Sequence, residues 1–175
     1  KTYSEAKTDY KKILEDYSAQ IKAKGATPVL VSPMTKIDTR PGEVNAAGLR
    51  DYPKAAVAAA KESNTALIDL NAMSVQLVTA LGPTLAPRAY VEGLHSKDYG
   101  GYLFARCIVE GIRQNHLPLA SALNDLATPF DPTHPGPPPR PLHPPPPHPP
   151  PPRCRRAPPP PPPPATPPPP PPPPP

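Results

Sequence analysis

Two short apolar runs decide the fold: ATPVLVSP at residues 26–33 and TALIDL at residues 65–70. Each run lies between turn-forming residues and lacks the polar alternation of a half-exposed strand, so each predicts a buried strand of a parallel sheet. Parallel strands need a crossover connection. The alanine-rich stretch from Lys54 to Glu62, preceded by Pro53 in a position that a first helical turn tolerates, predicts the crossover helix.

Further helices are predicted where apolar residues recur every three or four positions. They cover Tyr3–Ile21 with Gly25 as the C′ residue, Asn71–Leu81 with Asn71 as the cap and Gly82 as the stop, Asp98–Asn115, and a short piece at residues 117–126. Residues 34–50 and 83–96 have no periodicity and are predicted to be loops. The predicted order is therefore α, β, α, β, α, α.

Strands that alternate with helices indicate βαβ units and an α/β fold, with a parallel sheet covered on both faces. Two strands are too few for such a sheet, because a parallel pair leaves two unpaired edges and cannot bury the apolar faces of these helices. We therefore expect that an N-terminal half with the remaining strands is missing. The chain is interpreted as the second half of an α/β domain.

Proline divides the chain into two regions. Of its 38 prolines, 7 lie in residues 1–128 and 31 in residues 129–175. We therefore predict one folded domain over residues 1–128 and a disordered tail over residues 129–175, with polyproline II structure in the proline runs. Arginines beside these runs suit a groove of an SH3, WW or profilin-like partner (Arg140, Arg153, Arg155 and Arg156). A stiff spacer and a compositional accident are the alternatives.

Several classes of function are disfavoured by composition. The net charge of +5 is spread without a basic stripe, so we expect no nucleic-acid partner. No apolar run is long enough to cross a bilayer, and we expect no membrane partner. Cys107 and Cys154, the two cysteines, fit no zinc pattern, and no metal or cofactor is implied. Cys107 is interpreted as a packing residue of its helix.

One pair of residues has the spacing of an acid–base pair. Glu92 precedes His95 by three residues, so its carboxylate can accept the Nδ1 proton of the imidazole and leave Nε2 free as a base. A solvated surface loop is the alternative explanation of this spacing. Asp69 is interpreted as a structural or capping residue after its strand, Ser32 as a turn residue before a proline, and Arg40 as a solvated loop residue.

The surrounding stretch EGLHSKDYGGYLFARCIVEGI, residues 92–112, resembles the last block of the SGNH (GDSL-type) hydrolases. The resemblance is greatest to rhamnogalacturonan acetylesterase-like members, and it rests on His95, residues 98–101, residues 105–107 and residues 109–112. It extends over KGATPVLVSP, YPKAAVAAAKESNTALIDLNAMS, LPLASAL and FDPTHP, so that it covers roughly residues 3–135.

This resemblance implies a three-layer α/β/α, flavodoxin-like fold and ester hydrolysis by a Ser-His-Asp triad, with His95 as the base and Glu92 as its orienting acid. The substrate would be an acetylated plant cell-wall polysaccharide, which is compatible with a secreted full-length parent. Neither the Gly-Asp-Ser block of the nucleophile nor the Gly-x-Asn-Asp block of the oxyanion hole occurs in the chain. Glu92 also stands where the family has aspartate; either it replaces that residue or a deletion in the loop shifts the alignment.

Overall fold

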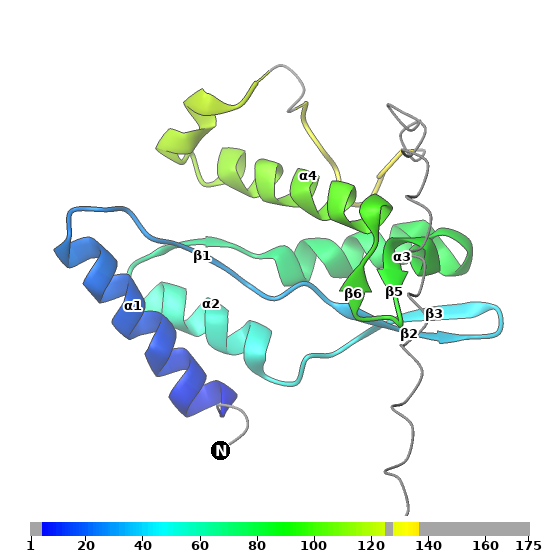
Figure 1. Cartoon of the computed structure of the whole chain (residues 1–175), viewed down its shortest axis with the longest axis horizontal. Helices are drawn as coiled ribbons and strands as arrows, with labels where there is room; N and C mark the ends of the chain where they lie inside the picture. The colour runs from blue at the N-terminus through cyan, green and yellow to red at the C-terminus, as the bar shows by residue number, and fades with distance from the viewer. Residues whose placement is uncertain (1–4, 125–127, 137–175) are drawn as a thin grey trace, which may run out of the picture. The chain divides into compact units, whose positions relative to one another are not determined.

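The computed structural model describes residues 5–124 and 128–136 (Figure 1). The predictions that concern Tyr3, Cys154, the arginines of the tail and its polyproline II runs lie outside these residues. The elements are η1 (Ala6–Tyr10), α1 (Lys11–Ala23), β1 (Val29–Val31), β2 (Lys36–Arg40), β3 (Glu43–Ala47), α2 (Tyr52–Glu62), β4 (Ala66–Ile68), α3 (Leu70–Ala89), β5 (Tyr90–Val91), β6 (His95–Ser96), α4 (Asp98–Gln114) and η2 (Pro118–Ala122).

The two predicted strands are confirmed as a parallel pair, β1 and β4, with Val29 opposite Ala66 and Val31 opposite Ile68. Their burial is less complete than predicted, because Ile68 is buried but Val31 is exposed. The crossover helix α2 packs on both strands, and α4 packs on β4. The strand pair lies between these helices in Figure 1, so the described residues have the layering of an α/β/α fold.

The first predicted helix is confirmed, and so is its end. Its first turn is a π-helix, η1, and α1 continues to Ala23. Gly25 has a φ of 77°, its N–H donates to Lys22 O at 2.9 Å, and the Ala26 N–H donates to Ile21 O at 3.2 Å. These two hydrogen bonds form a Schellman motif, which needs the left-handed conformation that glycine adopts without strain.

The prediction of a loop over residues 34–50 was wrong. Strands β2 and β3 form an antiparallel hairpin in which Lys36 pairs with Ala47 and Arg40 with Glu43. Pro41 and Gly42 make its turn, and the φ of Gly42 is 77°, which is the geometry of a type II turn. The hairpin packs on α3 through few apolar side chains, and Asp38, Arg40 and Glu43 remain exposed. The sequence therefore lacks a regular apolar alternation.

The prediction of a loop over residues 83–96 was wrong as well. Helix α3 breaks at Gly82, where φ is 62°, but a second helical segment follows and runs to Ala89. Pro83 opens this segment, where its missing N–H costs no helical hydrogen bond. The cap of α3 is Asp69 and not Asn71, because the Asp69 side chain accepts from the Ala72 N–H at 3.1 Å.

The core lies between α3, α4 and the strand pair. Leu77, Val78, Leu103 and Cys107 are almost completely buried, which confirms the packing role predicted for Cys107. The segment of residues 128–131 packs back on α4, where the Arg106 guanidinium lies 4.5 Å from the centre of the Phe130 ring. The folded part therefore continues some residues past the boundary predicted between residues 128 and 129.

Candidate active site

The hairpin β5–β6 carries the predicted His95 and Glu92. Tyr90 pairs with Ser96 and Val91 with His95, and the Leu94 N–H donates to Val91 O at 3.0 Å. Both central residues of the turn have positive φ, 55° at Glu92 and 77° at Gly93, as a type I′ turn requires. His95 is therefore held in a short strand three residues before α4 begins, rather than in the loop that the sequence predicted.

Within this hairpin, the structure brings the two predicted site residues together. His95 Nδ1 lies 3.6 Å from Glu92 Oε2, somewhat beyond hydrogen-bond length. Both side chains are exposed, at 71% and 73%. The carboxylate faces Nδ1, so Nε2 is the ring nitrogen directed elsewhere, as a base acting on an incoming group requires.

Two backbone hydrogen bonds fix the hairpin on the rest of the molecule. The Ile37 N–H of β2 donates to Gly93 O at 2.8 Å, and the Lys97 N–H donates to Ala89 O at 2.9 Å. A Cβ on Gly93 would lie 2.5 Å from Ile37 O, so this close approach excludes a larger residue. The position of His95 thus depends on β2 and α3, which the sequence did not connect with the site.

A buried hydroxyl adds a third contact. The Tyr90 hydroxyl donates to Thr35 O at 2.8 Å, and both residues are about 2% exposed. Thr35 lies between β1 and β2, so this hydrogen bond ties the first residue of β5 to the chain that leaves the carboxyl end of β1. Burial raises the pKa of Tyr90, and the hydroxyl remains a donor at ordinary pH.

At the carboxyl ends of the parallel strands, the polar side chains form hydrogen bonds with neighbouring groups of the protein. Ser32 Oγ donates to Asp69 Oδ1 at 2.7 Å and accepts from the Asn71 N–H at 2.8 Å. Ser74 Oγ accepts from the Thr35 N–H at 2.8 Å. Ser32 is 1% exposed and its hydroxyl is engaged on both sides, so it is a structural residue and not a nucleophile.

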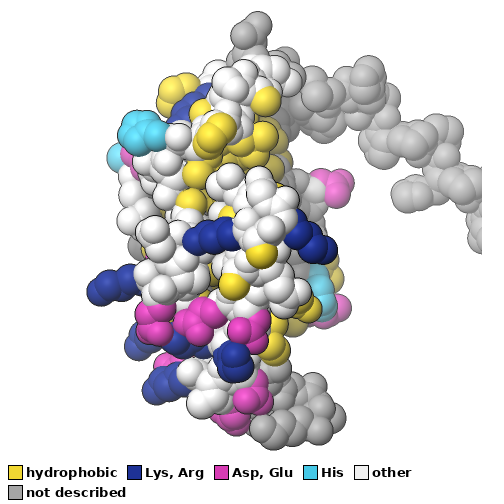
Figure 2. Space-filling view, turned by 90° about the vertical axis from the view of Figure 1, so that its left-hand side faces the viewer, with side chains coloured by type: hydrophobic (Ala, Val, Ile, Leu, Met, Phe, Trp, Pro, Cys, Tyr) yellow, Lys and Arg dark blue, Asp and Glu magenta, His cyan; other side chains and the backbone are white. Residues whose placement is uncertain are grey.

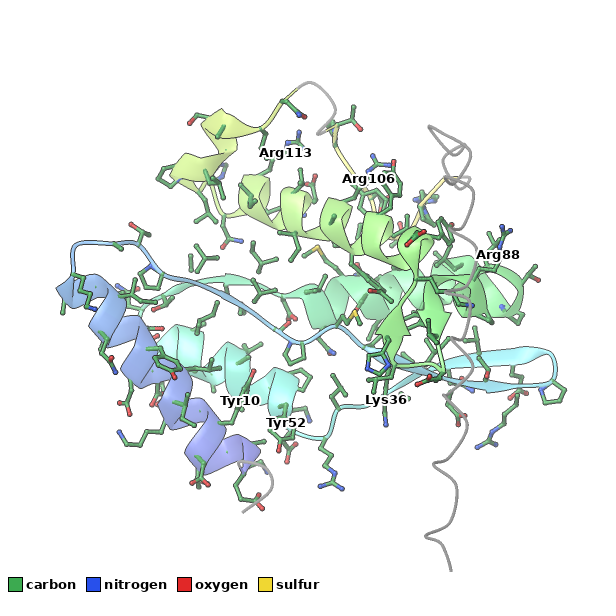
Figure 3. All side chains as sticks on the ribbon, in the orientation of Figure 1. Tyr10, Lys36, Tyr52, Arg88, Arg106 and Arg113 are labelled. Carbon is green, nitrogen blue, oxygen red and sulfur yellow. The ribbon has the colours of Figure 1, made fainter. Side chains whose placement is uncertain are left out.

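A second acid–histidine pair, which the sequence analysis did not single out, follows α4. Asp131 Oδ2 lies 2.8 Å from His134 Nδ1, and hydrogen bonds from His134 and Thr133 lower the Asp131 pKa to about 2. Its Asp-x-x-His spacing was a usable signal. Arg40 is exposed, as predicted, but it lies in β2 and not in a loop, and it pairs with Asp38 at 3.6 Å. Figure 3 draws the side chains and labels Lys36 of the same strand.

In the residues that the structure describes, no group of three or more potential ligands could hold a metal ion. None of the helices among those residues has the length and apolar character that a membrane crossing would need.

Comparisons with known proteins identify two similar proteins of Bacillus subtilis. No family model matches the chain. It is 30% identical over 115 residues to YxiM of Bacillus subtilis, described as an uncharacterized esterase, which covers 64% of this chain and 30% of YxiM. It is also 30% identical over 130 residues to YesY of the same organism, described as a probable rhamnogalacturonan acetylesterase, which covers 69% of this chain and 58% of YesY.

The fold agrees with one of these relatives. The crystal structure of YxiM matches with a TM-score of 0.57 and 30% identity, over 65% of this chain and 33% of that chain. The chain thus spans between about a third and three fifths of the length of these relatives. Over about two thirds of its own length, this chain is a homologue of the bacterial esterases YxiM and YesY, in agreement with the resemblance to SGNH-type esterases.

Proposed function

We propose that the chain is part of a serine ester hydrolase that removes O-acetyl groups from a plant cell-wall polysaccharide such as rhamnogalacturonan. The proposal rests on one observation above all: in a homologue of esterases, Glu92 lies against Nδ1 of His95 at 3.6 Å. The similarity to YesY supports the acetylated polysaccharide as the substrate class.

His95 acts as the base in this proposal. A serine from another part of the enzyme attacks the acetyl carbonyl while His95 Nε2 takes its proton, and the imidazolium then returns the proton to the departing sugar oxygen. Water then attacks the acyl-serine while His95 takes its proton, and the imidazolium returns that proton to the serine oxygen as acetate leaves. Glu92 holds the tautomer and stabilises the imidazolium; its distance to His95 shortens when the site is complete, since such contacts tighten in the substrate complex.

The chain alone lacks the nucleophile in this scheme. It has no Gly-Asp-Ser block and no Gly-x-Asn-Asp block, and Ser32 is buried and bonded on both sides. Loss of the nucleophile of a triad costs about 10⁶ in kcat. We therefore expect the isolated chain to be inactive toward esters.

The test is a chimera in which the part of YesY outside the 130 matched residues is fused to this chain. We expect the chimera to release acetate from acetylated rhamnogalacturonan and to hydrolyse p-nitrophenyl acetate. His95→Ala should remove this activity, whereas His116→Ala should leave it unchanged, because His116 lies in the turn after α4. An active chimera that tolerates His95→Ala would exclude His95 as the base.

A second candidate function uses the tail. The 31 prolines of residues 129–175, with arginines beside them, support a ligand for an SH3, WW or profilin-like domain. A pull-down with such domains tests this interaction. Binding that is lost when residues 137–175 are deleted supports it, and absence of binding from the whole chain rejects it.

A further inference from the structure

The backbone of the β5–β6 hairpin places Lys97 on the same face as His95. Val91 of β5 pairs with His95 of β6. Two residues further along, the Lys97 N–H continues this ladder by donating to Ala89 O at 2.9 Å, and Lys97 is itself extended, with a φ of −85° and a ψ of 175°. Side chains two residues apart in an extended segment leave it on the same face, so those of His95 and Lys97 do so, with their Cα atoms about 7 Å apart.

This face of the hairpin is the one that solvent reaches. Tyr90, which precedes Val91 and therefore lies on the other face, is 2% exposed and donates its hydroxyl to Thr35 O. The side chain of His95 is 71% exposed, and Lys97 is exposed as well. A ligand that approaches the imidazole thus meets the ammonium group on the same side of the hairpin.

Lys97 has no acidic partner among the residues that the structure describes. Other lysines do have one: Lys12 of α1 pairs with Asp16 at 3.0 Å. Figure 2 shows acidic and basic side chains close together over the lower part of the molecule, the level at which Figure 1 places α1 and α2. In the β5–β6 hairpin, the Glu92 carboxylate faces His95 Nδ1 instead of Lys97. The positive charge of Lys97 is therefore available to an anionic ligand.

The position of Lys97 in the fold gives no structural reason for a lysine. It is the N-cap residue of α4, and its side chain makes no capping hydrogen bond. Serine, threonine, aspartate and asparagine stabilise this position because their oxygens accept from the first N–H groups, whereas a positive charge is repelled by the positive end of the helix dipole. A residue that breaks such a local rule beside a candidate site is expected to serve the site.

From these observations we propose that Lys97 is a specificity-determining residue, whose ammonium group binds the carboxylate of a uronic acid unit next to the acetyl ester on which His95 acts. The inference rests on the proposed function, whose substrate class is acidic: a rhamnogalacturonan contains galacturonic acid, and each such unit carries a carboxylate beside hydroxyls that an acetyl group can esterify. One ligand thus presents an ester to His95 and a negative charge to Lys97.

The experiment titrates the whole chain with an oligogalacturonate at low salt and follows the backbone amides by NMR. We expect shifts in residues 95–101 and much weaker shifts with the methyl ester of the same oligosaccharide, which has no carboxylate charge. Lys97→Ser should weaken binding about fivefold, the contribution of an exposed ion pair, and the difference should shrink at about 0.5 M salt. The same variant should have a higher thermal midpoint, because serine caps α4.

Lys61→Ala is the matched control, since Lys61 is an exposed lysine of α2 and its loss lowers the net charge by the same amount. We expect it to bind the oligogalacturonate as the unchanged chain does. Three results would overturn the inference: equal affinity for the oligosaccharide and its methyl ester, equal weakening in the Lys97 and Lys61 variants, or shifts confined to amides remote from β6.

The chimera with YesY distinguishes this inference from the proposed function. In an active chimera, Lys97→Ser should lower the ratio of kcat/KM for acetylated rhamnogalacturonan to kcat/KM for p-nitrophenyl acetate about fivefold. An inactive chimera, together with binding that depends on Lys97, rejects the proposed function alone. An active chimera in which Lys97→Ser leaves this ratio unchanged rejects the role of Lys97 alone.

Discussion

The close contact between α3 and α4 gives a sharp prediction at Gly100. A Cβ on this residue would overlap the Ala89 carbonyl oxygen and lie 2.9 Å from its carbonyl carbon and 3.2 Å from its Cα. The obstacle is backbone, which cannot rotate away, so the beginning of α4 must retreat from α3. Overpacking of this kind costs about 1–3 kcal/mol. The same oxygen accepts the Lys97 N–H at 2.9 Å, and losing that hydrogen bond costs about 1 kcal/mol more.

The stability that alanine adds through its higher helix propensity is smaller than this cost of overpacking and of the lost hydrogen bond. Alanine is favoured over glycine within a helix by about 1 kcal/mol. Gly100→Ala should therefore lower the free energy of unfolding by about 2 kcal/mol, which is about 6–10 °C in the thermal midpoint for a domain of this size. Circular dichroism at 222 nm during heating and in urea measures both quantities.

Gly101→Ala supplies the matched control, because a Cβ on Gly101 meets no atom within 4 Å. We expect this variant to match the unchanged chain or to exceed it by up to about 1 kcal/mol. If Gly100→Ala is as stable as the unchanged chain, or if the two variants shift alike, then α4 does not pack on Ala89 as described and the position assigned to the hairpin before it is wrong.

Further predictions concern three buried or paired groups. Tyr90→Phe should destabilise the chain by about 1–2 kcal/mol in urea unfolding, because a buried carbonyl loses its donor; an unchanged midpoint would contradict this. Burial raises the pKa of Cys107 to about 12, so in a Cys154→Ser variant Ellman's reagent should react at pH 8 only as fast as the protein unfolds. Asp131, with its pKa lowered from 3.8 to about 2, contributes stability that is present above pH 3.8 and lost as the pH falls toward 2. In His134→Ala, the Asp131 pKa measured by NMR should return toward 3.8, and an unchanged value would exclude the pair.

The parallel strands and their crossover helix could be predicted because each gives a local signal: an apolar run between turns for β1 and β4, and an alanine-rich stretch after Pro53 for α2. Burial leaves a continuous apolar run in each strand, and short flanking turns mark its ends. The hairpin of β2 and β3 could not be found in this way. It packs along one face through Ile37 and Val44, and the charged residues between them hide the alternation. The Pro41–Gly42 pair was the remaining signal, and it indicates a turn without showing which residues pair across it.

For the candidate site, the sequence predicts the two residues that lie close together along the chain, Glu92 and His95. The spacing of Glu92 and His95 indicates that they can meet, and a turn of two positive-φ residues brings them together. What fixes the turn comes from distant parts of the chain, the Ile37 N–H and the Thr35 carbonyl. Such contacts depend on tertiary packing, which no local pattern encodes.

The central claim is that the chain holds the base of an esterase site together with its orienting acid, but no nucleophile. Hydrolysis of p-nitrophenyl acetate by the isolated chain, compared with its His95→Ala variant, tests this claim most directly. We predict that the two proteins give the same rate, indistinguishable from a surface-matched control protein. Turnover by the unchanged chain that His95→Ala abolishes would show that a nucleophile is present, and it would contradict the claim.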